Sequence, residues 1–184
     1  MIVRMQFGSH LYGTSTPQSD TDYRGVFLPA VGDQAHHEVA MSDKPSVILV
    51  DIDGTIALRG DRDPYDASKA MEDAVNWPVV EVIYALMREY GHRVQLLTGR
   101  DEQDRDVTEY WLRAHRLDGG FWHPPLFMRS RGDVRSDEIV KEEIYRTHIE
   151  PHYTVFCVFD DRDRVVQMWR RIGLTCLQVA EGNF

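Results

Sequence analysis

Short apolar segments alternate with helix-like segments from Pro45 to the end of this 184-residue chain. Apolar runs of this length, separated by amphipathic stretches, are typical of buried parallel strands joined by crossover helices. Such alternation is built as right-handed βαβ units. The sequence therefore predicts an α/β fold, a Rossmann-like parallel sheet with helices on both faces. The expected strands are Ser46–Val50, Val94–Leu97, Pro125–Met128, Val155–Phe159 and Thr175–Val179.

Four helices are expected between these strands. The first has Pro78 near its first turn and ends at Gly91, as helices that begin with proline and stop at glycine do. The others are expected over residues 102–114, 137–148 and 162–171. The apolar face of the first helix is predicted to carry Val79, Ile83, Leu86, Met87 and Tyr90.

Composition narrows the class of protein. No apolar run approaches the roughly 18 residues that a membrane span needs, so we predict no membrane association. The only two cysteines, Cys157 and Cys176, lie inside apolar runs and are interpreted as small buried side chains in a reducing compartment, which favours a cytoplasmic protein. A net charge of −9 and a pI near 5.3 argue against broad binding to polyanions but leave room for a local basic groove.

Polar side chains occur where four of the expected strands end. Asp51 and Asp53 follow the first strand, and the Thr98-Gly99-Arg100 segment follows the second. Lys141 lies early in the helix after the third strand, and Asp160 and Asp161 come at the end of the fourth. Ligands of parallel sheets bind at the carboxyl ends of the strands, so we expect these groups to form one site.

These residue types suit the transfer of a phosphoryl group. A carboxylate nucleophile that approaches an anionic phosphomonoester needs its repulsion cancelled, and Mg²⁺ prefers carboxylate oxygens and bridges to phosphate. Lys141 adds a fixed positive charge, and a threonine hydroxyl and backbone N–H groups can meet charge on the phosphoryl oxygens.

The segments DIDGT, LLTGR and FDDR, together with Lys141, resemble the four motifs of the haloacid dehalogenase superfamily of phosphatases. A closer resemblance, over about 140 residues, is to the phosphatase domain of phage polynucleotide kinase/phosphatases. It is carried by DIDGTIALRGDRDPYD, WPVVEVIYAL, LTGR, RSDEIVKEEIYRTHIEPHY, FDDR, VVQMWRRIGL and QVAEGNF. The resemblance implies a haloacid dehalogenase-like fold and a Mg²⁺-dependent phosphomonoesterase that removes 3′-phosphates from DNA or RNA ends.

The resemblance also implies residue roles. Asp51 would be the nucleophile that forms an aspartyl-phosphate, and Asp53 the general acid and then the general base. Asp51, the Asp53 backbone carbonyl and Asp161 would hold Mg²⁺, with Asp160 close by. Thr98, Gly99 and Lys141 would bind the phosphate, and Arg62 and Arg100 would lie near the substrate. Asp137 would orient Lys141 or an arginine.

Three of these roles have a structural alternative. Arg62 can be a solvated loop residue, Asp137 a helix N-cap, and Asp160 a side chain that orients its loop without touching metal.

The size of the segment between Asp53 and Thr98 bears on the substrate. A loop and one long helix leave room for only a minimal cap, so the expected crevice admits a polymer end. Arg129, Arg131 and Arg135 can follow a phosphate backbone or be ordinary surface arginines. Trp111 and Trp122 can stack on bases or fill a core.

Two other functions remain open at this point. One is a phosphatase of small nucleotides or metabolites that uses the same site. The other is a binding module related to nucleotidyltransferases, in which the phosphatase half is vestigial.

Residues 1–30 resemble the start of a DNA polymerase β-type nucleotidyltransferase, through Gly8-Ser9 and Asp20-x-Asp22. Residues 31–44 are predicted to be a linker, and residues 45–184 a phosphatase domain. The third carboxylate of that transferase family has no room before the phosphatase domain, so no transferase activity is expected. This segment can dock, support a homo-oligomer or be disordered, and Met41 is a plausible alternative start. Gly8–Ser15 lacks the lysine of a phosphate-binding loop, so no kinase activity is expected either.

Overall fold

The computed structural model describes residues 2–7, 22–27, 44–60, 67–117 and 124–182, which fall in two compact units, Met1–Met41 and Ser42–Phe184. In the first unit, β1 (Ile2–Phe7) and β2 (Asp22–Phe27) form an antiparallel pair. Their register places Ile2 opposite Phe27 and Phe7 opposite Asp22.

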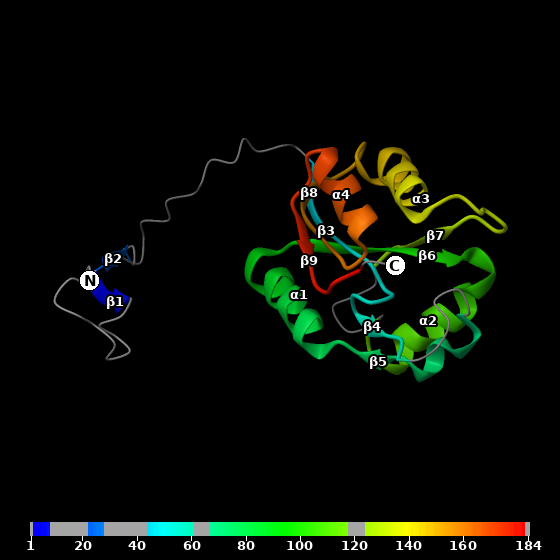
Figure 1. Ribbon diagram of the computed structural model, residues 1–184, viewed down its shortest axis with the longest axis horizontal. Helices are drawn as coiled ribbons and strands as arrows, with labels where there is room; N and C mark the ends of the chain where they lie inside the picture. The colour runs from blue at the N-terminus through cyan, green and yellow to red at the C-terminus, as the bar shows by residue number, and fades with distance from the viewer. Residues whose placement is uncertain (1, 8–21, 28–43, 61–66, 118–123, 183–184) are drawn as a thin grey trace. The chain divides into compact units, whose positions relative to one another are not determined.

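The second unit is built on a five-stranded parallel sheet with the order β7-β6-β3-β8-β9 (Figure 1). The central strand is β3, whose residues Val47 to Val50 are completely buried. From β3 the chain extends the sheet first through β6 and β7 on one side, and then through β8 and β9 on the other. The strand order therefore reverses beside β3, which is where parallel α/β sheets form their ligand crevice. The other strands are β6 (Arg93–Asp101), β7 (Leu126–Arg129), β8 (Thr154–Asp160) and β9 (Cys176–Gln178).

Helices cover both faces of this sheet. Figure 1 shows α1 (Trp77–Tyr90) and α2 (Arg105–Ala114) on one face, with α3 (Asp137–Ile144) and α4 (Asp163–Arg171) on the other. Each face has its own apolar cluster: Trp111 of α2 belongs to the first and Trp169 of α4 to the second. The predicted α/β architecture is confirmed.

Helix α1 shows how the sequence sets its own boundaries. Pro78 occupies the first turn, and Gly91 ends the helix in a left-handed conformation with φ 70°, donating its N–H to the Met87 carbonyl at 2.9 Å. The predicted apolar face is wrong at its last residue, because Tyr90 is 73% exposed. The other four predicted residues do contact the core: Ile83 is completely buried, and Val79, Leu86 and Met87 pack partly buried against it. Val80, which the sequence analysis missed, is also completely buried.

Two segments differ from the sequence-based expectation. Strand β6 does not stop at Leu97 but continues to Asp101, which pairs with Arg129 of β7 after a register shift. The Thr98-Gly99-Arg100 segment therefore lies within the end of a strand and not after it. The region between Asp53 and α1 also contains more structure than a loop: β4 (Ala57–Leu58), the 3-10 helix η1 (Ala67–Glu72) and β5 (Ala74–Val75), with β4 and β5 antiparallel.

Two short helical segments complete the unit. A 3-10 turn, η2 (Glu102–Asp104), precedes α2, and a π-helical segment, η3 (Tyr145–Ile149), follows α3. Together α3 and η3 span the region predicted as one helix. Within the described residues, no helix combines the length and the apolar character needed to cross a bilayer.

The cysteines behave as the sequence predicts. Both Cys157 and Cys176 are free and buried. Burial raises the pKa of Cys157 to about 11, and burial together with the nearby Asp160 carboxylate raises that of Cys176 to about 12. Both therefore act as small core side chains.

Candidate active site

The turn after β3 is fixed by its own backbone. The Asp51 N–H donates to the Phe159 carbonyl of β8 at 3.0 Å, which keeps Asp51 in line with the sheet. Next, the Ile52 carbonyl accepts from the N–H groups of Thr55, Ile56 and Ala57 at 2.9–3.2 Å. This tight turn requires a left-handed residue, which Gly54 supplies with φ 78°.

Lys141 joins two carboxylates from neighbouring strands. Its Nζ lies 2.7 Å from Asp51 Oδ1 and 2.9 Å from Asp160 Oδ2, and its side chain is buried. Burial by itself lowers the pKa of Lys141, but the carboxylates of Asp160, Asp51 and Asp137 outweigh it and hold the pKa above its ordinary value. The ammonium is therefore a permanent positive charge at the carboxyl edge of the sheet.

Three buried carboxylates share this place. Ligand oxygens of Asp51, Asp160 and Asp161 all lie within 4.8 Å of one another. Burial, followed by repulsion from Asp160 and Asp161, raises the pKa of Asp51 well above its ordinary value despite the lowering effect of Lys141. One ammonium does not balance three carboxylates. The donor set, all oxygen and with excess negative charge, fits a hard divalent cation such as Mg²⁺.

Asp160 has additional bonds that orient it. Its Oδ1 accepts from the Arg162 backbone N–H at 3.2 Å, and its Oδ2 accepts from Trp169 Nε1 at 3.3 Å. These contacts accord with the interpretation that Asp160 orients the loop, while Asp51 and Asp161 line the cavity.

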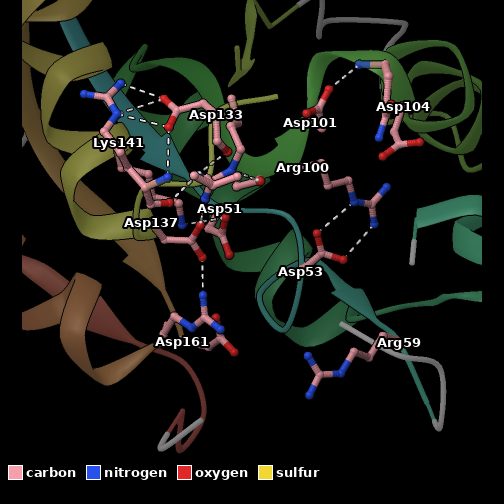
Figure 2. Close-up of a pocket in the computed structure, with 16 residues that line it drawn as sticks. Asp51, Asp53, Arg59, Arg100, Asp101, Asp104, Asp133, Asp137, Lys141 and Asp161 are labelled. Carbon is pink, nitrogen blue, oxygen red and sulfur yellow. Dashed lines mark hydrogen bonds and ion pairs between the residues drawn. The ribbon is translucent and has the colours of Figure 1, made fainter. Parts of the chain in front are cut away.

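Asp53 has a different partner from Asp51. Both of its carboxylate oxygens are bonded by Arg100, with Nε at 2.7 Å from Oδ2 and Nη2 at 2.8 Å from Oδ1 (Figure 2). This bidentate arrangement is the strongest geometry for an arginine–carboxylate pair. Among the described residues, the Asp53 side chain does not belong to the metal-type carboxylate group.

Arg100 is itself held by residues that the sequence analysis missed. Its Nη2 donates to Asp73 Oδ2 at 3.2 Å and its Nη1 to Thr108 Oγ1 at 3.2 Å. The Asp73 backbone carbonyl in turn accepts from Trp111 Nε1 at 2.9 Å. No local pattern marks Asp73 or Thr108. Once the structure shows that Arg100 is buried, further partners are expected, because an arginine has more N–H donors than one carboxylate has oxygens.

Asp137 connects three strand ends. Its two oxygens accept from Arg129 Nη2 and Arg162 Nη1, so it orients two arginines, whereas its effect on Lys141 is only through charge. Arg129 also donates from Nε to the Gly99 carbonyl at 2.8 Å. Gly99 is close to Asp137, since a Cβ on it would lie 2.5 Å from Asp137 Oδ1. Asp137 is not the helix cap, because Ser136 occupies the N-cap position of α3 and Asp137 is the first residue of the helix.

A cavity of about 390 Å³ brings most of the candidate residues together. It is lined by Asp51, Asp53, Gly99, Arg100, Asp137, Lys141 and Asp161, among others. Thr98 is completely buried beneath it, where its hydroxyl accepts the Arg100 N–H at 3.2 Å. Arg62 lies outside the described residues, as do Trp122, Gly8-Ser9, Asp20 and Met41.

The structure bears on two further interpretations. Arg129 is bonded to Asp137, and Arg135 to Asp133 and Glu143, and both arginines line the cavity. That they and Arg131 follow a phosphate backbone stays a prediction. Trp111 does not stack on a ligand, because it is completely buried in the core.

Gly54 provides a test of the carboxylate group. A Cβ at this position would overlap the Asp161 carboxylate, and its φ of 78° disfavours any other residue. Gly54→Ala is expected to lower Mg²⁺ affinity at least tenfold, measured by calorimetry, and to lower the free energy of unfolding by about 1–3 kcal/mol.

Gly60→Ala is the matched control, because Gly60 also has a positive φ (57°) but no atom within 4 Å of the added Cβ. It should share the loss of stability from the backbone and keep the affinity for Mg²⁺. Equal Mg²⁺ affinity in the two variants would contradict the expectation that a side chain at position 54 displaces the Asp161 carboxylate.

The pH dependence of stability provides a second test. Burial and the neighbouring Asp160 raise the pKa of Asp161 from 3.8 to about 6 in the metal-free protein. Between about pH 4 and 6 the folded state therefore holds a proton that the unfolded state releases, so stability rises as the pH falls. Between pH 7 and pH 5 the metal-free protein is expected to gain about 1 kcal/mol from Asp161, and Asp161→Asn should lose this gain.

The measurement is urea unfolding of both proteins in EDTA at several pH values. The comparison with Asp161→Asn removes the contribution of histidines, which titrate in the same range. Parallel stability curves for the two proteins would contradict the assignment.

Comparisons with known proteins identify the family of this chain. The model of the polynucleotide kinase PNKP phosphatase domain matches residues 45–184. A putative bifunctional polynucleotide kinase/RNA ligase of Autographa californica nuclear polyhedrosis virus is 30% identical over 138 residues, which are 74% of this chain and 20% of that protein. An uncharacterized 38.9 kDa protein from the nrdC-mobD intergenic region of Enterobacteria phage T4 is 56% identical over 32 residues, 17% of this chain and 10% of that protein.

Solved structures agree with the sequence comparisons. A structure of a Pnkp1/Rnl/Hen1 complex is similar with a TM-score of 0.70 and 34% identity, over 93% of this chain and 57% of that one. A structure of the Pnkp1/Rnl/Hen1 RNA repair complex has a TM-score of 0.71 and 34% identity, over 96% and 54%. The class C acid phosphatase of Bacillus anthracis shares the fold, with a TM-score of 0.51 and 14% identity over 78% and 69%.

The chain thus spans about a fifth of the viral relative and little more than half of the matched chains in the two Pnkp1/Rnl/Hen1 complexes. The family model nevertheless covers most of the present chain, including every strand of the parallel sheet and the whole carboxylate site. This chain belongs to the family of polynucleotide kinase phosphatase domains, of the haloacid dehalogenase type.

Proposed function

We propose that the protein is a Mg²⁺-dependent phosphomonoesterase that removes the 3′-phosphate from nucleic-acid ends through an aspartyl-phosphate on Asp51. The observation that carries this proposal is the division between two carboxylates two residues apart. Asp51 lies with Lys141, Asp160 and Asp161, whereas Asp53 faces the cavity with both oxygens bonded to Arg100.

In the first step, an Asp51 oxygen would attack phosphorus as the bond to the 3′-oxygen breaks. Mg²⁺ held by Asp51, the Asp53 backbone carbonyl and Asp161, with Asp160 close by, would supply the positive charge that lets a carboxylate approach an anionic phosphoryl group. Lys141 is already bonded to Asp51 Oδ1, so its ammonium lies next to the attacking group. Its charge opposes the negative charge on the phosphoryl oxygens.

Asp53 would move the protons. It would give a proton to the leaving 3′-oxygen and then take one from the water that hydrolyses the aspartyl-phosphate. Arg100 holds the Asp53 carboxylate in one orientation through its two bonds.

A nucleic-acid end is supported as the substrate by the family and by the shape of the site. The viral relative is described as a polynucleotide kinase/RNA ligase, and the Pnkp1 complex as an RNA repair complex. Between Asp53 and α1 the described residues form only two short strands and a 3-10 helix, which is a minimal cap. We assign neither kinase nor transferase activity to residues 1–30, whose Gly8–Ser15 segment lacks the lysine of a phosphate-binding loop.

A substrate panel tests the proposal. Phosphate release is measured with Mg²⁺ and with EDTA on one oligonucleotide sequence as DNA and as RNA, phosphorylated at the 3′ end or at the 5′ end, and on a 3′-mononucleotide. Release from at least one 3′-phosphorylated oligonucleotide, with Mg²⁺ only and not from the 5′ isomers, is expected. A kcat/KM for the mononucleotide well above that for both oligonucleotides would favour the small-molecule phosphatase instead.

A further inference from the structure

The loop between β7 and α3 is held rigid on the rim of the cavity. Within it, the Asp133 N–H donates to the Ser130 carbonyl at 3.0 Å. The Gly132 N–H donates to Asp101 Oδ2 at 2.7 Å, which ties the loop to the end of β6. This bond, together with one from the Gln103 N–H, lowers the pKa of Asp101 and keeps it ionised as an acceptor. The loop is therefore ordered before any ligand arrives.

Arg129 fixes the tip of the same loop. Its Nη1 donates to the carbonyl of Asp133 at 3.2 Å and to that of Arg135, the two residues on either side of Val134. The Asp133 carboxylate accepts the Arg135 N–H at 2.9 Å and also pairs with the Arg135 guanidinium. Val134 thus stands on a backbone clamped from both sides.

The side chain of Val134, on this hydrogen-bonded backbone, is apolar and exposed. Val134 is 95% exposed, more than any other large apolar side chain among the described residues, and it lines the cavity that holds Asp51 and Asp53. A single exposed valine on a surface needs no explanation. A valine on a hydrogen-bonded loop at the rim of this cavity is positioned to contact a ligand, because little conformational entropy is lost when the loop binds.

A second cavity lies on the other side of the loop. It has a volume of about 150 Å³, and Asp133 and Arg135 line both it and the first cavity. The loop is therefore a ridge between the two cavities, with Val134 at its tip. The second cavity has a mixed lining, with Phe127, Val140 and Ile144 among its apolar residues and Ser130, Glu143 and Thr147 among its polar ones. The exposed His148 ring also lines it and stacks on Phe127 with centroids 5.5 Å apart.

We propose that the substrate strand leaves the catalytic cavity across this ridge, with its terminal nucleoside against Val134 and the preceding base over the second cavity. This inference rests on the proposed function. The stacked rings of His148 and Phe127 line the second cavity, and aromatic side chains of this kind accept a base of any sequence by stacking. Arg135 on the ridge is bonded to Asp133 and Glu143. Recognition along this path is by apolar contact and stacking.

The test uses three substrates on the full chain with Mg²⁺: p-nitrophenyl phosphate, a 3′-mononucleotide and a 3′-phosphorylated trinucleotide. Val134→Ser should raise KM for both nucleotides about fivefold to tenfold with kcat kept, and leave the aryl phosphate unchanged. His148→Ala should raise KM for the trinucleotide alone, about threefold to tenfold, because only that substrate reaches the second cavity.

Two control variants change residues of the same type or sequence neighbourhood that lie outside the proposed path. Val82→Ser changes a half-exposed valine on α1, and Arg146→Ala changes an exposed residue two positions before His148 that does not line the cavity. Both should leave all three substrates unchanged. Unaltered nucleotide KM in Val134→Ser, or an equal change for the aryl phosphate, would overturn the inference alone. A wild-type protein that hydrolyses the aryl phosphate but neither nucleotide would overturn the proposed function as well.

Discussion

Asp51→Asn is expected to abolish phosphate release, with a fall in kcat of about 10⁴-fold or more. Asparagine has the shape of aspartate but offers no nucleophilic oxygen, so the covalent step cannot occur. The folded protein should tolerate the change. Burial and two neighbouring carboxylates already hold the pKa of Asp51 well above its ordinary value, which means that the metal-free fold disfavours the charge that asparagine removes.

Three measurements separate these effects: phosphate release with excess Mg²⁺, urea unfolding in EDTA, and trapping of the phosphoenzyme by acid quench. The variant should unfold within about 1 kcal/mol of the wild type and trap no phosphate. Asp106→Asn, at an exposed position on α2, is the matched control and should retain full turnover. Activity of Asp51→Asn within tenfold of the wild type would remove Asp51 as the nucleophile.

Lys141→Met should produce the largest loss of stability. Methionine fills a similar volume but leaves Asp51, Asp160 and Asp161 buried together without their cation. Removing one partner of a buried ion pair typically costs about 3–5 kcal/mol. We expect a loss of this size in EDTA at pH 7.5 and a partial recovery of stability with Mg²⁺. The value of kcat should be at least about 100-fold below the wild type, because the ammonium that opposes the negative charge of the phosphoryl group is lost.

A double-mutant cycle with Asp160→Asn identifies the cause. If repulsion among carboxylates destabilises Lys141→Met, neutralising Asp160 in the same protein should restore a large part of the lost stability. Lys69→Met, at an exposed position on η1, is the control for loss of a lysine and should be nearly neutral. Additive effects of Lys141→Met and Asp160→Asn would contradict the coupling seen in the structure.

The sheet and its carboxyl edge were predictable because their signals are local. The alternation of apolar runs with segments of helical periodicity shows which segments of the chain are strands and which are helices. Asp51 and Asp160 lie where two of the apolar runs end. The end of β6 was not predictable in this way. Thr98 to Asp101 are polar and read as a loop, but Asp101 pairs with Arg129 of β7, a neighbour supplied by tertiary structure.

The partners of the site residues were also beyond the sequence. Asp73 lies 27 residues from Arg100 and Thr108 lies eight from it, and nothing in their local sequence distinguishes them from other polar residues. Arg129 was interpreted as part of a basic patch because charge in a sequence does not show which carboxylate opposes it. The structure places Asp137 against it. Residue types at strand ends can be read from a sequence, but the pairing among them requires the fold.

The carboxylate of Asp137 has a mechanical consequence. It bonds Arg129 at the end of β7 and Arg162 after β8, and it lies against Gly99 near the end of β6. Three separate parts of the rim therefore meet at one carboxylate. A substitution at Asp137 removes the contacts of all three parts at once, so the shape of the rim depends on this single side chain.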